Sequence, residues 1–505
     1  MRQGTRSAPP RAGAMLESLR GLGYSTGAAL ADIIDNSVSA GASEVLLDFH
    51  WDGARSRISI LDDGRGMDDG ELESAMRLGD KNPLQVRHPG DLGRFGMGLK
   101  TASLSQCRRL TVASSKAGVI SCLRWDLDAL AATSGTDWLL FEGPAEGSEE
   151  CLAPIRERCH GTLVLWECLD RVVTPGYTPD DFLAMIDRVE AHLAMVFHRL
   201  LEGSHPRLRL LINRRRVEPW DPFMTGSPAK PWTSSLARTF TVAGPVEVEC
   251  HVLPHQDRLS ADEFTKMAGP EGWTAQQGFY VYRNQRLLVA GGWLGLGTGR
   301  AWNREEAHRL ARIRLDIPNT ADAAWKIDIR KSSARPPVSL RPWLTDLAER
   351  TRERARKVFA FRGSPVTGPR GGAVEPAWQA VRTRSGTRYR IDEKHPAVAA
   401  VLEVAGEICP LVRAMLRVIE ETVPVQRIWL DTAEGRETPR TGFAGEPDET
   451  IVGIAGILYA DMVGRRGMSD EAAKRLLMAT EPFQNYPALV ASLRGNSSND
   501  RTRIG

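Results

Sequence analysis

The segment LADIIDNSVSA, residues 30–40, places Asp32, Asp35 and Asn36 among apolar residues. The apolar residues recur at helical spacing and predict a helix whose buried stripe is formed by Leu30, Ile33, Ile34 and Val38. Asp32 and Asn36 are four residues apart and therefore share a separate face of that helix. A carboxylate and a carboxamide placed this way can hold a water molecule and an oxygen-liganded Mg2+ side by side. An ordinary surface helix with a polar face has the same pattern, so the motifs that follow are needed to distinguish a ligand site from a surface helix.

A second motif, DDGRGMDD at residues 62–69, follows a run with strand alternation at residues 56–61. It places the Asp62 carboxylate at the end of a strand, and the glycines that follow let the backbone approach a flat ligand closely. Such a carboxylate can accept a hydrogen bond from an exocyclic amine such as that of adenine. Taken alone, the motif also fits an ordinary Asp-Gly turn.

The third motif is GDLGRFGMGLKTAS, residues 90–103, in which Gly93, Gly96 and Gly98 precede a helix-like run at 99–104. Free backbone amides at the start of that helix would face an anion. The motif is not a P-loop, because Leu99 separates Gly98 from Lys100, and its glycine spacing is not that of the dinucleotide-binding fingerprint.

A fourth element is Gly161-Thr162, which opens a strand-like run ending at residue 167. The Thr162 hydroxyl could donate to the carboxylate of Asp62 or to a water beside it. This element is the least specific of the four, because many strands begin this way.

In this order and spacing, the four motifs resemble the GHKL ATPase superfamily, which includes gyrase, the ninety-kilodalton heat-shock chaperone, histidine kinases and MutL. The resemblance covers about residues 15 to 170 and implies an α/β sandwich of the Bergerat fold that binds ATP and Mg2+. It assigns the catalytic carboxylate to Asp32 and the Mg2+ ligand to Asn36. It assigns nucleotide contacts to Asp62, Gly64, Gly66, Met67, Gly93, Gly96, Met97, Gly98, Leu99, Lys100, Thr101 and Thr162. The ending GLKTAS most resembles the microrchidia (MORC) branch and its bacterial relatives.

One position departs from the family pattern, because most ATP-hydrolysing members carry Glu where this chain has Asp32. The shorter side chain retracts the carboxylate by about 1.5 Å, one carbon–carbon bond. General-base catalysis depends on hydrogen-bond reach to the attacking water. Slow hydrolysis, or ATP binding as a switch without hydrolysis, is therefore an open alternative.

Composition is consistent with an intracellular ATPase of two or three domains. Hydrophobic residues make up 42% of the 505 residues, and no apolar run reaches membrane-spanning length. The first residues lack the apolar core of a signal peptide. The seven cysteines include no C-x-x-C pair and favour a reducing cytoplasm. A net charge of +3 is too small to indicate nucleic-acid binding by itself.

A second α/β domain is predicted after the first, beginning with a helix at residues 179–201 and ending with one at 343–361. Strands are predicted at 208–219, 246–254, 278–292 and 311–317, the third of them a hairpin turning at residues 283–286. This domain resembles the transducer of gyrase, MutL and MORC proteins, which has a ribosomal-protein-like fold. In those relatives a transducer lysine reaches the γ-phosphate. Lys326 is favoured for that role, with Lys331 as the alternative.

The predicted domains are residues 1–175 for the ATPase and 176–361 for the transducer. A Gly-, Pro- and Arg-rich linker at 362–385 and a helical C-terminal domain at 386–505 follow. Within the last domain, Ser469 is a plausible N-cap. The run NRRR at 213–216 and the arginines at 300, 309, 312 and 314 could contact phosphates, although solvated strand edges explain them equally well.

The resemblance implies an ATP-dependent switch in which ATP and Mg2+ order a lid between Gly79 and Gly98 and close two protomers into a homodimer. For MORC-like bacterial proteins it further implies work on DNA in antiphage-defence or restriction operons, with helicase or nuclease partners and no membrane. Two alternatives stay open: a non-hydrolysing ATP-sensing scaffold for partner proteins, and a chaperone resembling the ninety-kilodalton heat-shock family.

Overall fold

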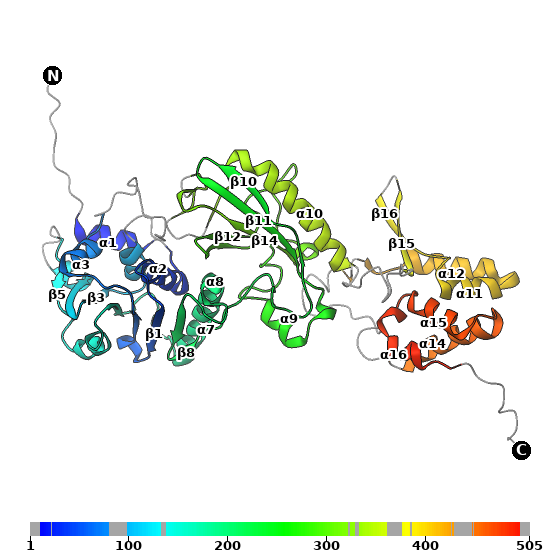
Figure 1. The fold of residues 1–505 in the computed structure, drawn as a ribbon, viewed down its shortest axis with the longest axis horizontal. Helices are drawn as coiled ribbons and strands as arrows, with labels where there is room; N and C mark the ends of the chain where they lie inside the picture. The colour runs from blue at the N-terminus through cyan, green and yellow to red at the C-terminus, as the bar shows by residue number, and fades with distance from the viewer. Residues whose placement is uncertain are drawn as a thin grey trace, which may run out of the picture. The chain divides into compact units, whose positions relative to one another are not determined.

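The computed structural model describes residues 11–21, 23–79, 98–132, 138–321, 324–328, 333–360, 376–383, 386–425, 427–428, 447 and 449–494 (Figure 1). Contacts between Cα atoms divide the chain into two compact units, Met1–Ala360 and Phe361–Gly505. No helix among these residues is both long and apolar enough to cross a membrane.

Eight strands form the larger sheet of the first unit, in the order β5-β4-β3-β6-β2-β1-β7-β8. Their bounds are β1 Glu44–His50, β2 Arg57–Asp62, β3 Arg109–Lys116, β4 Val119–Asp126, β5 Phe141–Glu142, β6 Gly161–Glu167, β7 Arg209–Ile212 and β8 Arg215–Arg216. Neighbouring strands are antiparallel except β1 and β7, which are parallel. The sheet therefore includes strands from well beyond residue 175, where the sequence predicts the end of the first domain.

The two faces of this sheet are covered by different elements. The helices of this part of the chain are α1 Ala12–Arg20, α2 Thr26–Ser39, α3 Asp69–Met76, α4 Gly98–Leu104, α5 Leu127–Ala132, α6 Ala153–Arg156, α7 Pro179–Val196 and α8 His198–Leu201. Alternate strand residues such as Ile58 and Ile60 share one core with the apolar stripe of α2. Leu163 and Leu165 face the other side, in a smaller core with Ile155 of α6. This alternation follows from the period of two in a β-strand.

Helix α2 begins at a side-chain cap, since the Ser25 hydroxyl accepts from the amide of Ala28 at 3.2 Å. The predicted stripe is confirmed, because Leu30, Ile33, Ile34 and Val38 are all buried. The helix packs against α4 on one side and α7 on another.

A second sheet in the same unit has the order β10-β11-β14-β12-β13, with β9 paired to β11. The bounds are β9 Trp232–Thr233, β10 Ala237–Thr241, β11 Gly244–Val252, β12 Gly278–Arg283, β13 Arg286–Ala290 and β14 Ala311–Asp316, with helices α9 Ala261–Met267 and α10 Arg341–Ala360. Helix α10 runs along β11 and β14 (Figure 1). The predicted hairpin is confirmed: Asn284 and Gln285 connect β12 to β13 with φ values of 48° and 68°, as two-residue hairpin turns require.

The run at residues 208–219 differs from the single strand that was predicted. Asn213 and Arg214 adopt φ values of 45° and 65°, so the chain reverses between β7 and β8. The Asn213 side chain also accepts from the amide of Phe49 on β1 at 2.8 Å. A positive φ is tolerated best by Asn among non-glycine residues, which explains the turn at this position.

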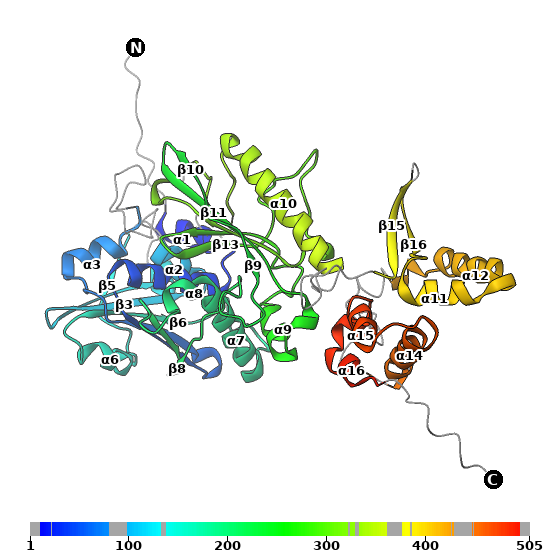
Figure 2. The same ribbon diagram turned by 45° about the vertical axis from the view of Figure 1, so that its right-hand side comes forward.

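The second unit contains a hairpin and a helical part (Figure 2). Its elements are β15 Trp378–Thr383, β16 Gly386–Ile391, α11 Pro396–Val404, α12 Cys409–Glu421, α14 Glu449–Ala460, α15 Asp470–Met478 and α16 Pro487–Ser492. Strand β15 lies inside the predicted linker at 362–385, because its backbone pairs with β16, a partner that composition does not reveal. The predicted cap at Ser469 is confirmed: its hydroxyl accepts from the amide of Ala472 at 3.3 Å.

Candidate active site

Asp62 is the last residue of β2 and has a buried carboxylate, 6% exposed, held by three donors. Its Oδ1 accepts from the amides of Gly64 at 2.9 Å and Thr162 at 3.1 Å, and its Oδ2 accepts from the Ser37 hydroxyl at 2.7 Å. Burial raises the pKa of Asp62, and these three hydrogen bonds oppose that shift. Ser37 was not among the site residues predicted from the sequence. The feature that could have identified Ser37 is its position next to Asn36, as a polar residue on the buried side of α2.

The glycines after Asp62 are required by close packing. A Cβ at Gly64 would lie 2.9 Å from the Cβ of Ala40, at the end of α2. Gly66 has a φ of +71°, and a Cβ there would lie only 1.8 Å from the Ser115 carbonyl oxygen on β3. The loop is therefore packed closely between α2 and β3. The predicted close approach to a flat ligand stays a prediction.

Thr162 and Met67 meet at a second serine, Ser114 on β3. The Thr162 hydroxyl lies 2.9 Å from the Ser114 hydroxyl, which accepts from the amide of Met67 at 2.9 Å. Of the two predicted partners of the Thr162 hydroxyl, Asp62 or a water beside it, the Asp62 carboxylate is not its partner here. Antiparallel pairing of Asp62 with Thr162 brings the backbone amide to the carboxylate instead.

Asp32 lies on α2 with 5% of its surface exposed. Its Oδ2 accepts from the Tyr24 hydroxyl at 3.0 Å, and its Oδ1 lies 3.8 Å from Nη2 of Arg286. A Cβ at Gly98 would be 3.9 Å from Asp32 Oδ2, so the first residue of α4 lies directly beside this carboxylate. Burial and the negative charge of Asp32 raise the pKa of Tyr24 well above its ordinary value, which keeps its hydroxyl a hydrogen-bond donor.

Asn36 and Asp35, one turn further along α2, have opposite environments. Asn36 is exposed, whereas Asp35 is 1% exposed and accepts from Nε of Arg286 at 3.2 Å. No group of three or more His, Cys, Asp or Glu side chains suited to a metal occurs among the described residues. The exposed Asn36 amide fits a Mg2+ that takes its remaining ligands from phosphate oxygens and water.

The described part of the third motif begins at Gly98. Leu99 is partly buried, and Lys100 is buried with its Nζ donating to the Ala75 carbonyl of α3 at 2.8 Å. Thr101 is buried and hydrogen-bonds to Tyr24. Lys100 is therefore held against α3, and Thr101 supports the Tyr24–Asp32 contact. Gly93, Gly96 and Met97 lie outside the described residues.

The second sheet contributes Arg286, which sequence reasoning did not single out. Lys326, the predicted γ-phosphate contact, is an exposed loop residue with a φ of +49°, and Lys331 lies outside the described residues. Of the arginines predicted to reach phosphates, Arg312 is 0% exposed, and Arg309 lies over aromatic rings including Phe359. Arg312 therefore belongs to the core of the second sheet, whereas Arg309 is partly buried and pairs with Glu306.

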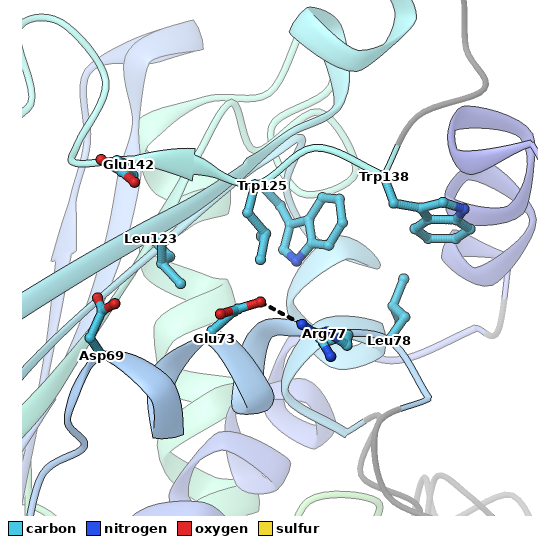
Figure 3. A pocket seen from close by; sticks show the side chains of 9 residues that line it. Asp69, Glu73, Arg77, Leu78, Leu123, Trp125, Trp138 and Glu142 are labelled. Atoms are coloured by element: carbon cyan, nitrogen blue, oxygen red, sulfur yellow. Dashed lines mark hydrogen bonds and ion pairs between the residues drawn. The ribbon is translucent and has the colours of Figure 1, made fainter.

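A cavity of about 700 Å³ opens between α3 and the β4–β5 edge (Figure 3). Its lining is Asp69, Glu73, Arg77, Leu78, Leu123, Trp125, Trp138, Leu140 and Glu142. Trp125 and Trp138 meet edge to face with ring centroids 6.3 Å apart, and Arg77 pairs with Glu73. Asp69 is the last residue of the second motif, but the lining includes neither Asp32 nor Asp62 nor any of the residues that contact them, so we treat the cavity as separate from that cluster.

Comparison with known proteins agrees with this geometry. Residues 24–162 match the family model described as histidine kinase-, DNA gyrase B-, and HSP90-like ATPase. The DNA mismatch repair protein MutL of Rhodospirillum rubrum is 33% identical over 124 residues, which are 24% of this chain. The chain spans only 17% of that relative's length. The domain that carries α2, Asp62 and α4 thus belongs to the GHKL ATPase superfamily.

Proposed function

We propose that this protein binds Mg2+ and ATP in its first domain and hydrolyses ATP slowly, as a dimerising switch that acts on DNA. The observation that carries the proposal is the placement of two buried carboxylates around α2. Asp62 hydrogen-bonds to Ser37 of this helix, and Asp32 lies on the helix beside the first residue of α4.

The Asp62 cluster supports adenine as the bound base. The oxygens of the Asp62 carboxylate already accept from three donors, so this site favours a ligand that presents N–H donors. The close packing at Gly64 and Gly66 leaves no room for a side chain at either position. An exocyclic amine would meet an acceptor already aligned by Ser37 and Thr162.

Asp32 supports hydrolysis through its fixed position. Its carboxylate is aligned by the Tyr24 hydroxyl and faces the start of α4, where the anionic end of a nucleotide is expected. As general base, Asp32 would accept the proton of the attacking water. The exposed Asn36 would hold Mg2+, whose chemistry is to neutralise phosphate charge.

The DNA and defence roles rest on the resemblance to MORC-like proteins. One surface supports them: Arg214, Arg215 and Arg216 are all exposed at the β8 edge of the first sheet. Arginines on an edge strand can contact a phosphate backbone. Homodimerisation on ATP binding and helicase or nuclease partners belong to the same proposal.

A second candidate is a non-hydrolysing ATP sensor, which the surroundings of Asp32 favour. One oxygen of this short carboxylate accepts from Tyr24, and the other faces Arg286. If those contacts persist when ATP is bound, a water would compete for the same oxygens.

Calorimetry with Mg·ATP tests the binding part of the proposal. Asp62→Asn should weaken ATP binding and the preference for ATP over GTP, since the amide can present donors to the base. Asn36→Ala should abolish the Mg2+ dependence of binding. Unchanged Mg·ATP affinity in both variants would place the nucleotide elsewhere. Phosphate release by the wild type then separates a hydrolase from a sensor.

A further inference from the structure

Arg286 joins the two sheets of the first unit at the candidate active site. It is the first residue of β13, follows Asp35 by 251 positions and is 4% exposed. Its Nε donates to Asp35 Oδ1 at 3.2 Å, and its Nη2 lies 3.8 Å from Asp32 Oδ1. Its Nη1 donates to the Leu287 carbonyl at 2.7 Å, which ties the guanidinium to its own strand. One side chain of the second sheet therefore contacts two carboxylates of α2.

Charge explains why this contact is strong. Asp32 and Asp35 are 5% and 1% exposed, and a buried carboxylate without a cation costs several kcal/mol of folding free energy. The planar guanidinium presents its donors in a fixed fork, which a lysine ammonium cannot reproduce. Arg286 therefore fixes Asp35 through a hydrogen bond and stabilises the nearby Asp32 carboxylate through its charge.

The surroundings of Arg286 make its position rigid. The guanidinium lies 5.9 Å from the ring centroid of Phe197, and the next residue, Leu287, is 1% exposed. His192 of α7 is close enough for the charge of Arg286, after burial, to lower the pKa of His192 to about 4. That histidine is therefore neutral near pH 7 and does not compete for the carboxylates.

We infer that Arg286 is a positioning residue through which the second sheet holds α2 and aims Asp32 at the start of α4. Movement of the β12–β13 hairpin would then displace Asp32, so the second sheet regulates hydrolysis without touching the nucleotide. The inference rests on the proposed function, because Asp32 is the group being aimed. It is independent of Lys326, whose predicted role is direct contact with the γ-phosphate.

Two variants test the inference while limiting damage to the fold. Arg286→Lys keeps the positive charge but loses the forked set of guanidinium donors. Arg286→Met combined with Asp35→Asn removes both members of the ion pair, so that no charged Asp35 carboxylate is left buried without its cation. We expect kcat to fall about 10- to 100-fold in both, as for a misplaced catalytic group. The calorimetric Kd for Mg·ATP should stay within about twofold. Arg199→Lys is the matched control, because Arg199 pairs with Asp316 at 2.6 Å rather than with α2, and its kcat should not change.

Hydrogen exchange of the α2 amides separates failure of the inference from failure of the proposed function. Wild-type protein that binds ATP without turnover would end the hydrolase proposal. Faster exchange in residues 26–39 of Arg286→Lys, but not of Arg199→Lys, would still support the inference. If both Arg286 variants have the kcat of the wild type and the same exchange rates of the α2 amides, the inference is overturned. A parallel loss of ATP affinity and kcat would overturn it as well, because Arg286 would then act on binding.

Discussion

Helices α2 and α12 have similar lengths and both carry apolar residues at helical spacing, but their environments are opposite. Ten of the 14 residues of α2 are buried, whereas α12 buries none of its 13. Leu411 and Val418 on α12 remain 70% and 62% exposed, while Ile34 on α2 is fully buried. Helical periodicity therefore predicts that a helix forms but not whether its apolar face is buried. Burial forces the polar groups of α2 to take fixed partners, and those partners build the site.

The largest effect is expected for the polar face of α2. Asp32→Ala should retain ATP binding and lose ~10² to 10⁴-fold in kcat, the usual contribution of a general base. Asp32→Glu should keep or raise kcat, since it restores the family's usual residue. Steady-state phosphate release with a binding control measures both. Equal turnover in Asp32→Ala and wild type would show that Asp32 is not the general base and that α2 contributes packing rather than catalysis.

The second-largest effect is expected for the buried stripe of α2. Ile34→Ala should lower the free energy of unfolding by about 2–5 kcal/mol, because the cavity cannot refill between the sheet and its neighbouring helices. Leu411→Ala on α12 is the matched control and should change stability by less than about 0.5 kcal/mol. Urea denaturation monitored separately for the two units measures both. A large loss in Leu411→Ala would show that the α12 face is covered in solution.

A pH effect is expected where α7 packs on α2. A Cβ at Gly27 would lie 3.1 Å from the ring of His192, whose pKa is lowered by burial to about 4 from 6.5. Between pH 4 and pH 6.5, His192 binds more protons in the unfolded state than in the folded state. The free energy of unfolding therefore falls as the pH drops from 6.5 to 4. The contribution is at most about 3 kcal/mol, at 1.36 kcal/mol per pKa unit. His192→Gln should flatten this slope in denaturant titrations at several pH values. An unchanged slope would mean that His192 is solvated.

The smallest effect concerns Ser37, the α2 residue that reaches Asp62. Ser37→Ala removes one donor to a buried carboxylate, which is worth about 1.5–3 kcal/mol when the partner is charged. ATP affinity should therefore weaken by roughly tenfold or more, with the helix intact. Calorimetry alongside circular dichroism tests this. Normal affinity would show that the two amide donors of Gly64 and Thr162 suffice.

Local sequence patterns predicted several elements in the two units. The stripe of α2, the strand ending at Asp62, the hairpin at residues 283–286 and the cap at Ser469 are all present. Each depends on residues close in sequence, through helical or strand period, turn chemistry or capping. The family of the first domain was also predictable, because its motifs lie in one order along one stretch of chain.

What the sequence by itself determined is therefore the set of local elements and the residue types able to bind Mg2+ and ATP. Tertiary structure alone decided their partners. Pairing of β7 beside β1, the turn of Lys100 towards Ala75 and the contact of Arg286 with α2 all join distant segments. Local propensity carries no information on which buried group a carboxylate will meet. That choice is made when the chain packs, because burial requires every charge to find a partner.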